Sequence, residues 1–174
     1  HVKGVRSYSQ SEFMVLDATT LRNLEVVRSI REGSTEGTLL ALMDRCSTAM
    51  GSRLIVGWLT QPLKDANAIA ERLDAVEEVV NSASARGEVK EVLRGMKDID
   101  RLASRVGYGN ASPRDLVALK DAIGRSQRLG SVLSSLKSAF IVKEPGELGD
   151  LSGLAGAISK GIDESAPPKA EIGY

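Results

Sequence analysis

A long run of helical spacing that starts at residue 112 constrains the fold more than any other feature. Ser112 is a favourable N-cap residue and Pro113 suits the first helical position, so the pair marks a helix start. The spacing predicts a helix of about 25 residues, about 37 Å long, in which Gly124 and Gly130 leave room for a bend or break near Gly130. Its apolar positions are Leu116, Leu119, Ile123, Leu129, Val132, Leu133 and Leu136.

Shorter stretches on both sides repeat this plan. Each follows a residue suited to capping, namely Asp17, Thr38, Ser47 or Thr48, Asp65 and Asp98. We expect the first helix to end near 31–37, Pro62 to stop the third, a turn at 81–87 and a short helix within 150–163. The predicted inward positions are Leu21, Leu24, Val27, Leu39, Leu40, Leu42, Met43, Met50, Leu54, Trp58, Ile69, Leu73, Val76, Val80, Val89, Val92, Leu93, Ile99, Leu102 and Val106.

Composition agrees with an all-α fold. Aromatic residues make up only 3% of the chain, whereas Ala, Leu and Val are abundant, which suits stacked aliphatic helices better than a β-sandwich or barrel. We therefore predict a single multi-helical array with one long helix, which the family resemblance given below would make a lever-type helix.

Charge and cysteine content exclude several classes of function. Lys and Arg total 23, as do Asp and Glu, so no global field attracts phosphate or anionic lipid. No apolar run approaches the roughly 20 residues of a membrane-spanning helix. One cysteine permits no internal disulfide, which fits the cytosol or nucleus.

The sequence gives little support for a catalytic or metal-binding site. Cys46 lacks a partner base because the only histidine is His1, so we interpret Cys46 as a small buried side chain beside Met43 and Met50. Neighbouring helical residues diverge by about 100 degrees. The carboxylates of 98–100 and 77–78 are therefore interpreted as solvated helix faces rather than metal ligands.

Two further stretches are candidates for phosphate binding. Residues 107–112, GYGNAS, lack the P-loop pattern and its lysine, which favours a turn between helices. The long helix has a mildly basic side, interrupted by Asp115 and Asp121, which we interpret as a solvated face rather than a phosphate contact. Its basic residues are Arg114, Lys120, Arg125 and Arg128.

Two glycines interrupt the apolar pattern of residues 36–63. Glycine lowers helix propensity, so Gly51 and Gly57 predict positions where a neighbouring helix crosses too closely for a side chain, with Trp58 filling the adjacent volume.

The order of these segments resembles the core domain of the MutS family of DNA mismatch-repair proteins. The resemblance is carried by LDATTLRNLEV, EGTLLALMDRCSTAMGSRLIVGWLTQPL and AIAERLDAVEEVV between Leu16 and Val80. It continues through MKDIDRLASRV and ASPRDLVALKDAI to Ile123, and more loosely to DESAPP.

The resemblance implies a non-catalytic helical hub that links a DNA-gripping clamp to an ATPase domain. ATP and Mg would belong to the ATPase domain of the parent protein, and mismatched duplex DNA and a second subunit would be partners of that parent. The chain itself would carry no catalytic, cofactor-binding or metal-binding residue. The expected compartment is the cytoplasm, or the nucleus in a eukaryote.

The same resemblance sets the expected boundaries. Residues 1–15 would form an arm, 16–165 the helical core, and 166–174 a tail where the family's clamp begins, with the core's returning helix missing. Two other interpretations stay open at this point, a stand-alone helical interaction module and a small enzyme that uses Cys46 or the pair Asp98 and Asp100.

Overall fold

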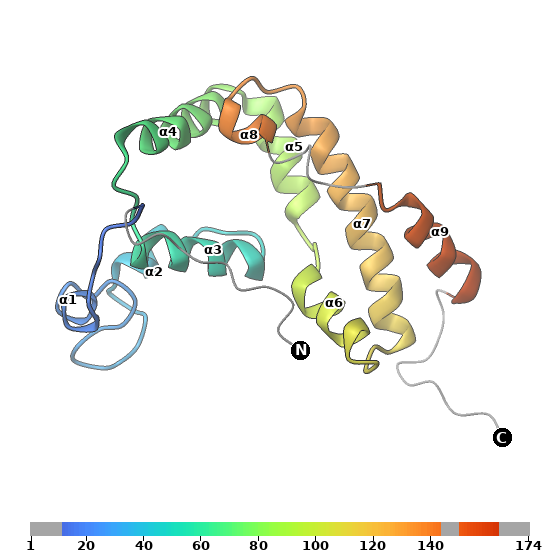
Figure 1. Cartoon of the computed structure of the whole chain (residues 1–174), viewed down its shortest axis with the longest axis horizontal. Coiled ribbons are helices and arrows are strands. Elements are labelled where there is room, and N and C mark those ends of the chain that lie inside the picture. The colour runs from blue at the N-terminus through green and yellow to red at the C-terminus, as the bar shows by residue number, and fades with distance from the viewer. Residues whose placement is uncertain (1–11, 144–149, 164–174) are drawn as a thin grey trace. The chain divides into compact units, whose positions relative to one another are not determined.

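The computed structural model describes residues 12–143 and 150–163, and this part of the chain is helical (Figure 1). Its one β-type contact is an isolated antiparallel bridge between Phe13 and Leu63. The predicted all-α class is confirmed. The helices are α1 (Ala18–Asn23), α2 (Leu39–Met43), α3 (Ala49–Thr60), α4 (Ala66–Asn81), α5 (Ala83–Leu93), α6 (Ile99–Gly107), α7 (Pro113–Leu133), α8 (Ala139–Lys143) and α9 (Ser152–Gly161).

Tertiary contacts divide the chain within α4. The first compact unit ends at Leu73 and the second begins at Asp74. Each unit is described by itself below.

Side-chain caps start the helices of the first unit, as the sequence predicts. The Asp17 carboxylate accepts a hydrogen bond from the backbone N–H of Thr20 at 2.6 Å. The hydroxyls of Thr38 and Thr48 play the same part for α2 and α3. Helix α3 ends at Thr60, two residues before Pro62, because the residue before a proline is disfavoured in the helical region.

Helix α1 is much shorter than predicted. It ends at Asn23, and Glu25 adopts a positive φ of 48° that a helix does not permit. The Glu25 carboxylate then accepts the backbone N–H of Ile30 at 2.6 Å. The turn buries Val26, whose carbonyl accepts from Leu40 N–H, while Leu24 is exposed against prediction.

Several predicted inward positions are exposed. Helical spacing defines which side chains share a face, but only a tertiary partner buries that face. In α2 only Leu40 is buried. The exposed positions are Leu24, Leu39, Leu42, Met43, Leu54, Ile69, Leu73, Val76, Val80 and Val106.

The glycine predictions for α3 need correction. A Cβ at Gly51 would lie 3.2 Å from the Cys46 Cβ and 3.2 Å from the Thr48 hydroxyl, so the close neighbour is the preceding turn and not a crossing helix. A Cβ at Gly57 would meet nothing within 4 Å. The Trp58 ring instead makes a cation–π contact with Arg72. The guanidinium carbon of Arg72 lies 4.1 Å from the ring centroid.

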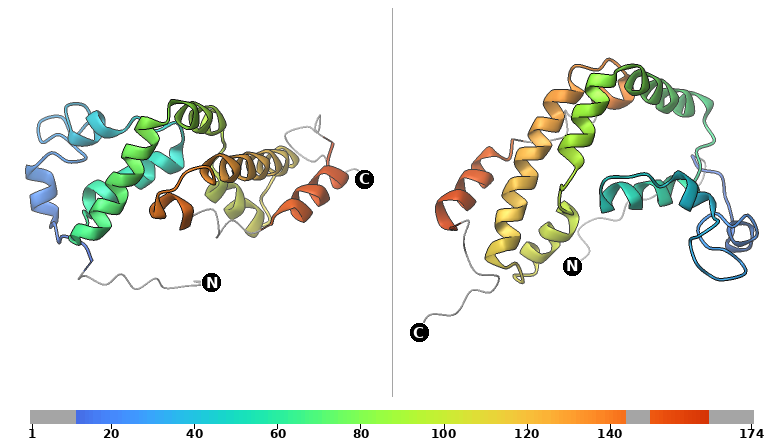
Figure 2. Two further views of the ribbon diagram at one scale, coloured as in Figure 1. Left: turned by 90° about the horizontal axis from the view of Figure 1, so that it is seen from above. Right: turned by 180° about the vertical axis from the view of Figure 1, so that it is seen from behind.

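The second unit is built around α7. Helices α5 and α6 contact one side of it and α9 lies along the other (Figures 1 and 2). Leu119 and Ile123 of α7 join Leu102 of α6 and Ile158 of α9 in one buried apolar cluster. Ala122 is 1% exposed, so its small side chain allows a close helix contact.

Helix α7 passes through Gly130 without a break and ends earlier than predicted. Its last residue is Leu133. The hydroxyls of Ser134 and Ser135 donate to the carbonyls of Ser131 and Val132 at 2.8 and 2.7 Å, which competes with continued helical hydrogen bonding. The separate helix α8 follows.

The turn predicted at residues 81–87 is also wrong in extent. Helix α4 continues to Asn81 and α5 begins at Ala83, so Ser82 alone separates them. Ala85, which the turn prediction left outside any core, is buried.

Gly51 and Gly124 both lie within helices but have different neighbours, and this difference gives a first prediction. A Cβ at Gly124 meets nothing within 4 Å, so Gly124→Ala should stabilise the chain by about 0.5–1 kcal/mol through helix propensity. Gly51→Ala should gain less because its Cβ presses on Cys46 and Thr48. Urea unfolding followed by circular dichroism measures both, and equal gains would contradict the crowding at Gly51.

Candidate functional site

Cys46 is exposed, which corrects the prediction of a small buried side chain beside Met43 and Met50. It lies in the turn between α2 and α3, whereas the prediction rested on the usual burial of free cysteine. Its backbone N–H donates to the Asp44 carboxylate at 3.1 Å, and the Ser52 hydroxyl donates to the same carboxylate at 3.2 Å.

The electrostatics around Cys46 oppose thiol chemistry. Partial burial of the sulfur, together with the Asp44 carboxylate, raises the pKa of the Cys46 thiol. The backbone N–H of Cys46 in turn lowers the pKa of Asp44. A thiol whose pKa is raised is less ionised near neutral pH, and the thiolate is the nucleophilic form. His1 lies outside the described residues.

Asp98 and Asp100 both lie at the start of α6. Asp98 is the N-cap of α6 and accepts the backbone N–H of Arg101 at 3.3 Å, while Asp100 lies in the first turn of the same helix. In residues 12–143 and 150–163, His, Cys, Asp and Glu form no group of three or more that could hold a metal ion. In the same ranges no helix is long and apolar enough to cross a membrane.

The prediction that Glu78 lies on a solvated helix face is incomplete, because its carboxylate makes hydrogen bonds within the structure. Its two carboxylate oxygens accept the backbone N–H groups of Lys137 and Ser138, each at 2.7 Å. These amides precede α8, so Glu78 fixes the start of α8 to α4 across about sixty residues of sequence. No pattern in the sequence indicated this contact, because it joins segments far apart in the chain.

Residues 108–112 form the predicted turn between α6 and α7, and Gly107 is the last residue of α6. Gly109 takes a φ of 69°, a conformation that glycine adopts without strain. Ser112 and Asp115 then form a capping box, in which the Asp115 side chain accepts the Ser112 N–H at 3.0 Å. Arg105 of α6 donates to the other Asp115 oxygen at 2.6 Å.

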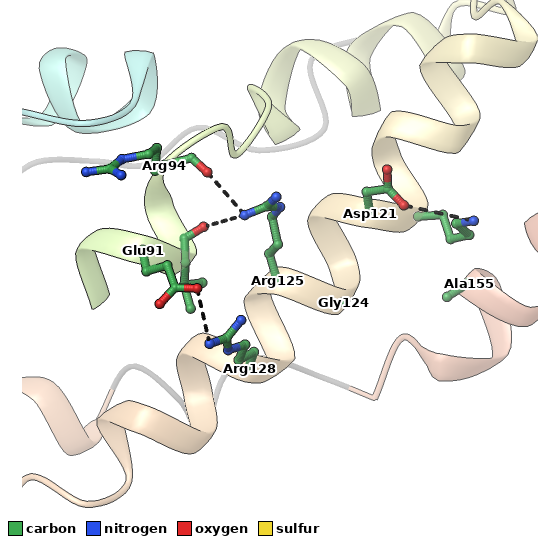
Figure 3. A pocket seen from close by; sticks show the side chains of 9 residues that line it. Glu91, Arg94, Asp121, Gly124, Arg125, Arg128 and Ala155 are labelled. Carbon is green, nitrogen blue, oxygen red and sulfur yellow. Dashed lines mark hydrogen bonds and ion pairs between the residues drawn. The ribbon is translucent and has the colours of Figure 1, made fainter. Parts of the chain in front are cut away.

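The basic side of α7 borders a groove of about 710 Å³ between α5, α7 and α9 (Figure 3). Arg125 donates through Nη1 to the carbonyls of Val92 and Arg94, each at 3.1 Å. Arg128 lies 3.8 Å from the Glu91 carboxylate, and Lys120 lies 3.9 Å from Asp121. The solvated-face interpretation therefore misses Arg125, which holds the C-terminal carbonyls of α5.

The described residues of the second unit pack as helices whose polar side chains cap helix starts and join neighbouring helices. Such an arrangement defines a helix-packing class of protein. The family model described as MutS domain III matches residues 19–174. The chain belongs to this family.

Curated relatives support the same assignment. The chain is similar to proteins named DNA mismatch repair protein MutS, with 42% identity in Methanothrix thermoacetophila and 38% identity in Desulforamulus reducens and in an Exiguobacterium species. The matches cover 87%, 96% and 99% of this chain but only 18%, 19% and 20% of those proteins. The chain thus spans about a fifth of the length of these relatives.

The Glu78 contact yields a prediction. Glu78→Ala removes the acceptor of two backbone N–H groups, which should cost about 1–2 kcal/mol of stability. Glu78→Gln keeps one acceptor oxygen and should lose less. Amide hydrogen exchange at Lys137 and Ser138 is the direct readout, and unchanged protection in Glu78→Ala would contradict the contact.

The capping box predicts an acid dependence. Hydrogen bonds from Ser112, followed by Arg105, lower the pKa of Asp115. A carboxylate whose pKa is lowered by folding stabilises the native state above its unfolded pKa of about 4, and this contribution disappears as the pH falls through the folded pKa. Asp115→Asn should therefore flatten the acid limb of a stability–pH curve measured by urea unfolding. If stability falls with acid as steeply in Asp115→Asn as in the unsubstituted chain, the proposed role of Asp115 is wrong.

Proposed function

We propose that this chain is the helical core of a MutS protein and links the DNA-gripping clamp of that protein mechanically to its ATPase domain. The observation that supports this role is the single apolar cluster through which α7 contacts α6 and α9. Close-packed cores move as units and switch between discrete arrangements, so helices joined in this way transmit a displacement instead of absorbing it.

Polar contacts add to the stiffness of this unit. Arg105 joins α6 to α7, and Arg125 joins α5 to α7 through two backbone carbonyls. Helix α7 spans 21 residues, about 31 Å at the usual rise, which suits a lever.

The remaining parts of the proposal concern the parent protein. Mismatched duplex DNA is the proposed substrate, a second MutS subunit the proposed partner, and ATP with Mg the proposed cofactors of the ATPase domain. The chain contributes no catalytic group of its own in this proposal. The proposed compartment is the cytoplasm, or the nucleus in a eukaryote.

A substitution that lowers the helix propensity of α7 tests the proposed mechanical role of this helix. Gln127 is exposed in the C-terminal half of α7, between Gly124 and Gly130. In a full-length MutS protein that contains this segment, Gln127→Gly adds a third glycine and about 1 kcal/mol of helix penalty. ATP should then change the DNA affinity of the variant less than it changes the DNA affinity of the unsubstituted protein.

Gln127→Ala is the matched control, because it removes the same side chain and preserves helix propensity. It should leave the effect of ATP on DNA affinity unchanged. Equal effects of ATP in the glycine and alanine variants, with ATP turnover and folding intact in both, would argue against a mechanical role for α7.

A further inference from the structure

We propose that a pocket beside α1 binds an acidic, apolar segment of the same MutS polypeptide, from the part that lies outside residues 1–174. Arg22 and Arg28 bind the carboxylates of this segment, and the aliphatic walls of the pocket bind its apolar side chains. The inference rests on family membership and on the charge and exposure of the pocket lining. It does not depend on the linking role.

The pocket has a volume of about 520 Å³ and is formed by α1 and the loop that follows it, within the first compact unit. Two of its lining residues, Arg22 and Arg28, are cations, and none is acidic. The neighbouring carboxylates of Asp17 and Glu25 already accept backbone N–H groups at 2.6 Å. A carboxylate that enters the pocket therefore meets no like charge in its lining.

The two guanidinium groups are available to a ligand. Neither the Arg22 nor the Arg28 side chain forms a hydrogen bond or ion pair with residues 12–143 or 150–163, and both residues are exposed. Arg105 and Arg125, by contrast, are engaged by Asp115 and by two backbone carbonyls. A ligand carboxylate thus gains charged donors without displacing a partner from them.

The apolar walls of this pocket are accessible. Ile30 is 51% exposed, and Leu21 and Val27 are half-buried. The loop that carries Ile30 is held by its own backbone, since the Ser29 N–H donates to the Ser34 carbonyl at 2.8 Å. Because the wall is in place before a ligand arrives, binding costs less conformational entropy.

The exposure of the pocket favours an occupant from the same polypeptide. Exposed ion pairs contribute little, and a pocket of this size admits only a short segment, so a free ligand would bind with an affinity on the order of millimolar. A tethered segment has an effective concentration in the same range. The chain spans only 18%, 19% and 20% of three MutS relatives, so most of such a polypeptide lies outside it.

The aliphatic walls favour a peptide over a DNA backbone. Phosphates gain affinity from the cations alone and leave Leu21, Val27 and Ile30 uncovered. A peptide side chain such as leucine covers these walls and removes their apolar surface from water. A segment that combines acidic and apolar residues therefore matches both parts of the lining.

The test uses a full-length MutS protein that contains this chain and carries Arg28→Lys. A carbodiimide joins a carboxylate to a lysine amine that contacts it, as an amide. Mass spectrometry should find position 28 joined to an Asp or Glu outside residues 1–174. In a mixture of isotope-labelled and unlabelled protein, both halves of this cross-link should carry the same label, because the occupant belongs to the same polypeptide.

Ile30→Ala in the Arg28→Lys protein should lower the yield of this cross-link about fivefold, because it removes an apolar wall. Arg31→Lys is the matched control, because Arg31 is an exposed arginine of the same loop that does not line the pocket. It should not form the cross-link. Circular dichroism checks that the variants keep their helix content.

Absence of the cross-link at position 28, or an equal yield in the Arg31→Lys control, would overturn the proposal. Cross-links with mixed labels would assign the pocket to a second subunit and overturn it as well. Absence of the cross-link together with weaker duplex DNA binding by Arg28→Glu than by Arg31→Glu would assign the pocket to nucleic acid instead.

Discussion

The apolar contact between the middle of α7 and its neighbours is the constraint on which the second unit depends. Leu119 and Ile123 meet Leu102 from α6 and Ile158 from α9, and Ala122 leaves the backbones room to approach. Burial of such side chains contributes about 1.5–3 kcal/mol each, whereas a helix cap contributes about 0.5–2 kcal/mol and an exposed ion pair about 0–1 kcal/mol. The contact sets the positions of the helices, and the polar contacts then fix their ends.

The polar side chains of this unit act mainly on backbone groups. Asp98 and Ser112 satisfy N–H groups at helix starts, Glu78 does the same for the start of α8, and Arg125 satisfies carbonyls at the end of α5. Helix ends leave such groups without partners inside the helix, so side chains that bind them also select one arrangement of the helices. The charged side chains of Asp98, Glu78 and Arg125 thus hold helix ends in place.

The chain belongs to the MutS domain III family, and the polar side chains described above cap helices and join them.

The sequence by itself determined the helical class and most helix starts, because capping and apolar spacing are local properties that residues such as Asp17, Thr48 and Ser112 express over three or four positions. The order of segments also indicated the family. Only the tertiary structure decided which apolar faces are buried, since Leu73 and Val80 have the spacing of a core face and are exposed, whereas Val26 lies in a turn and is buried. It likewise decided the contacts of Glu78 and Arg125, because their partners lie about 59 and 33 residues away, beyond the reach of any local pattern.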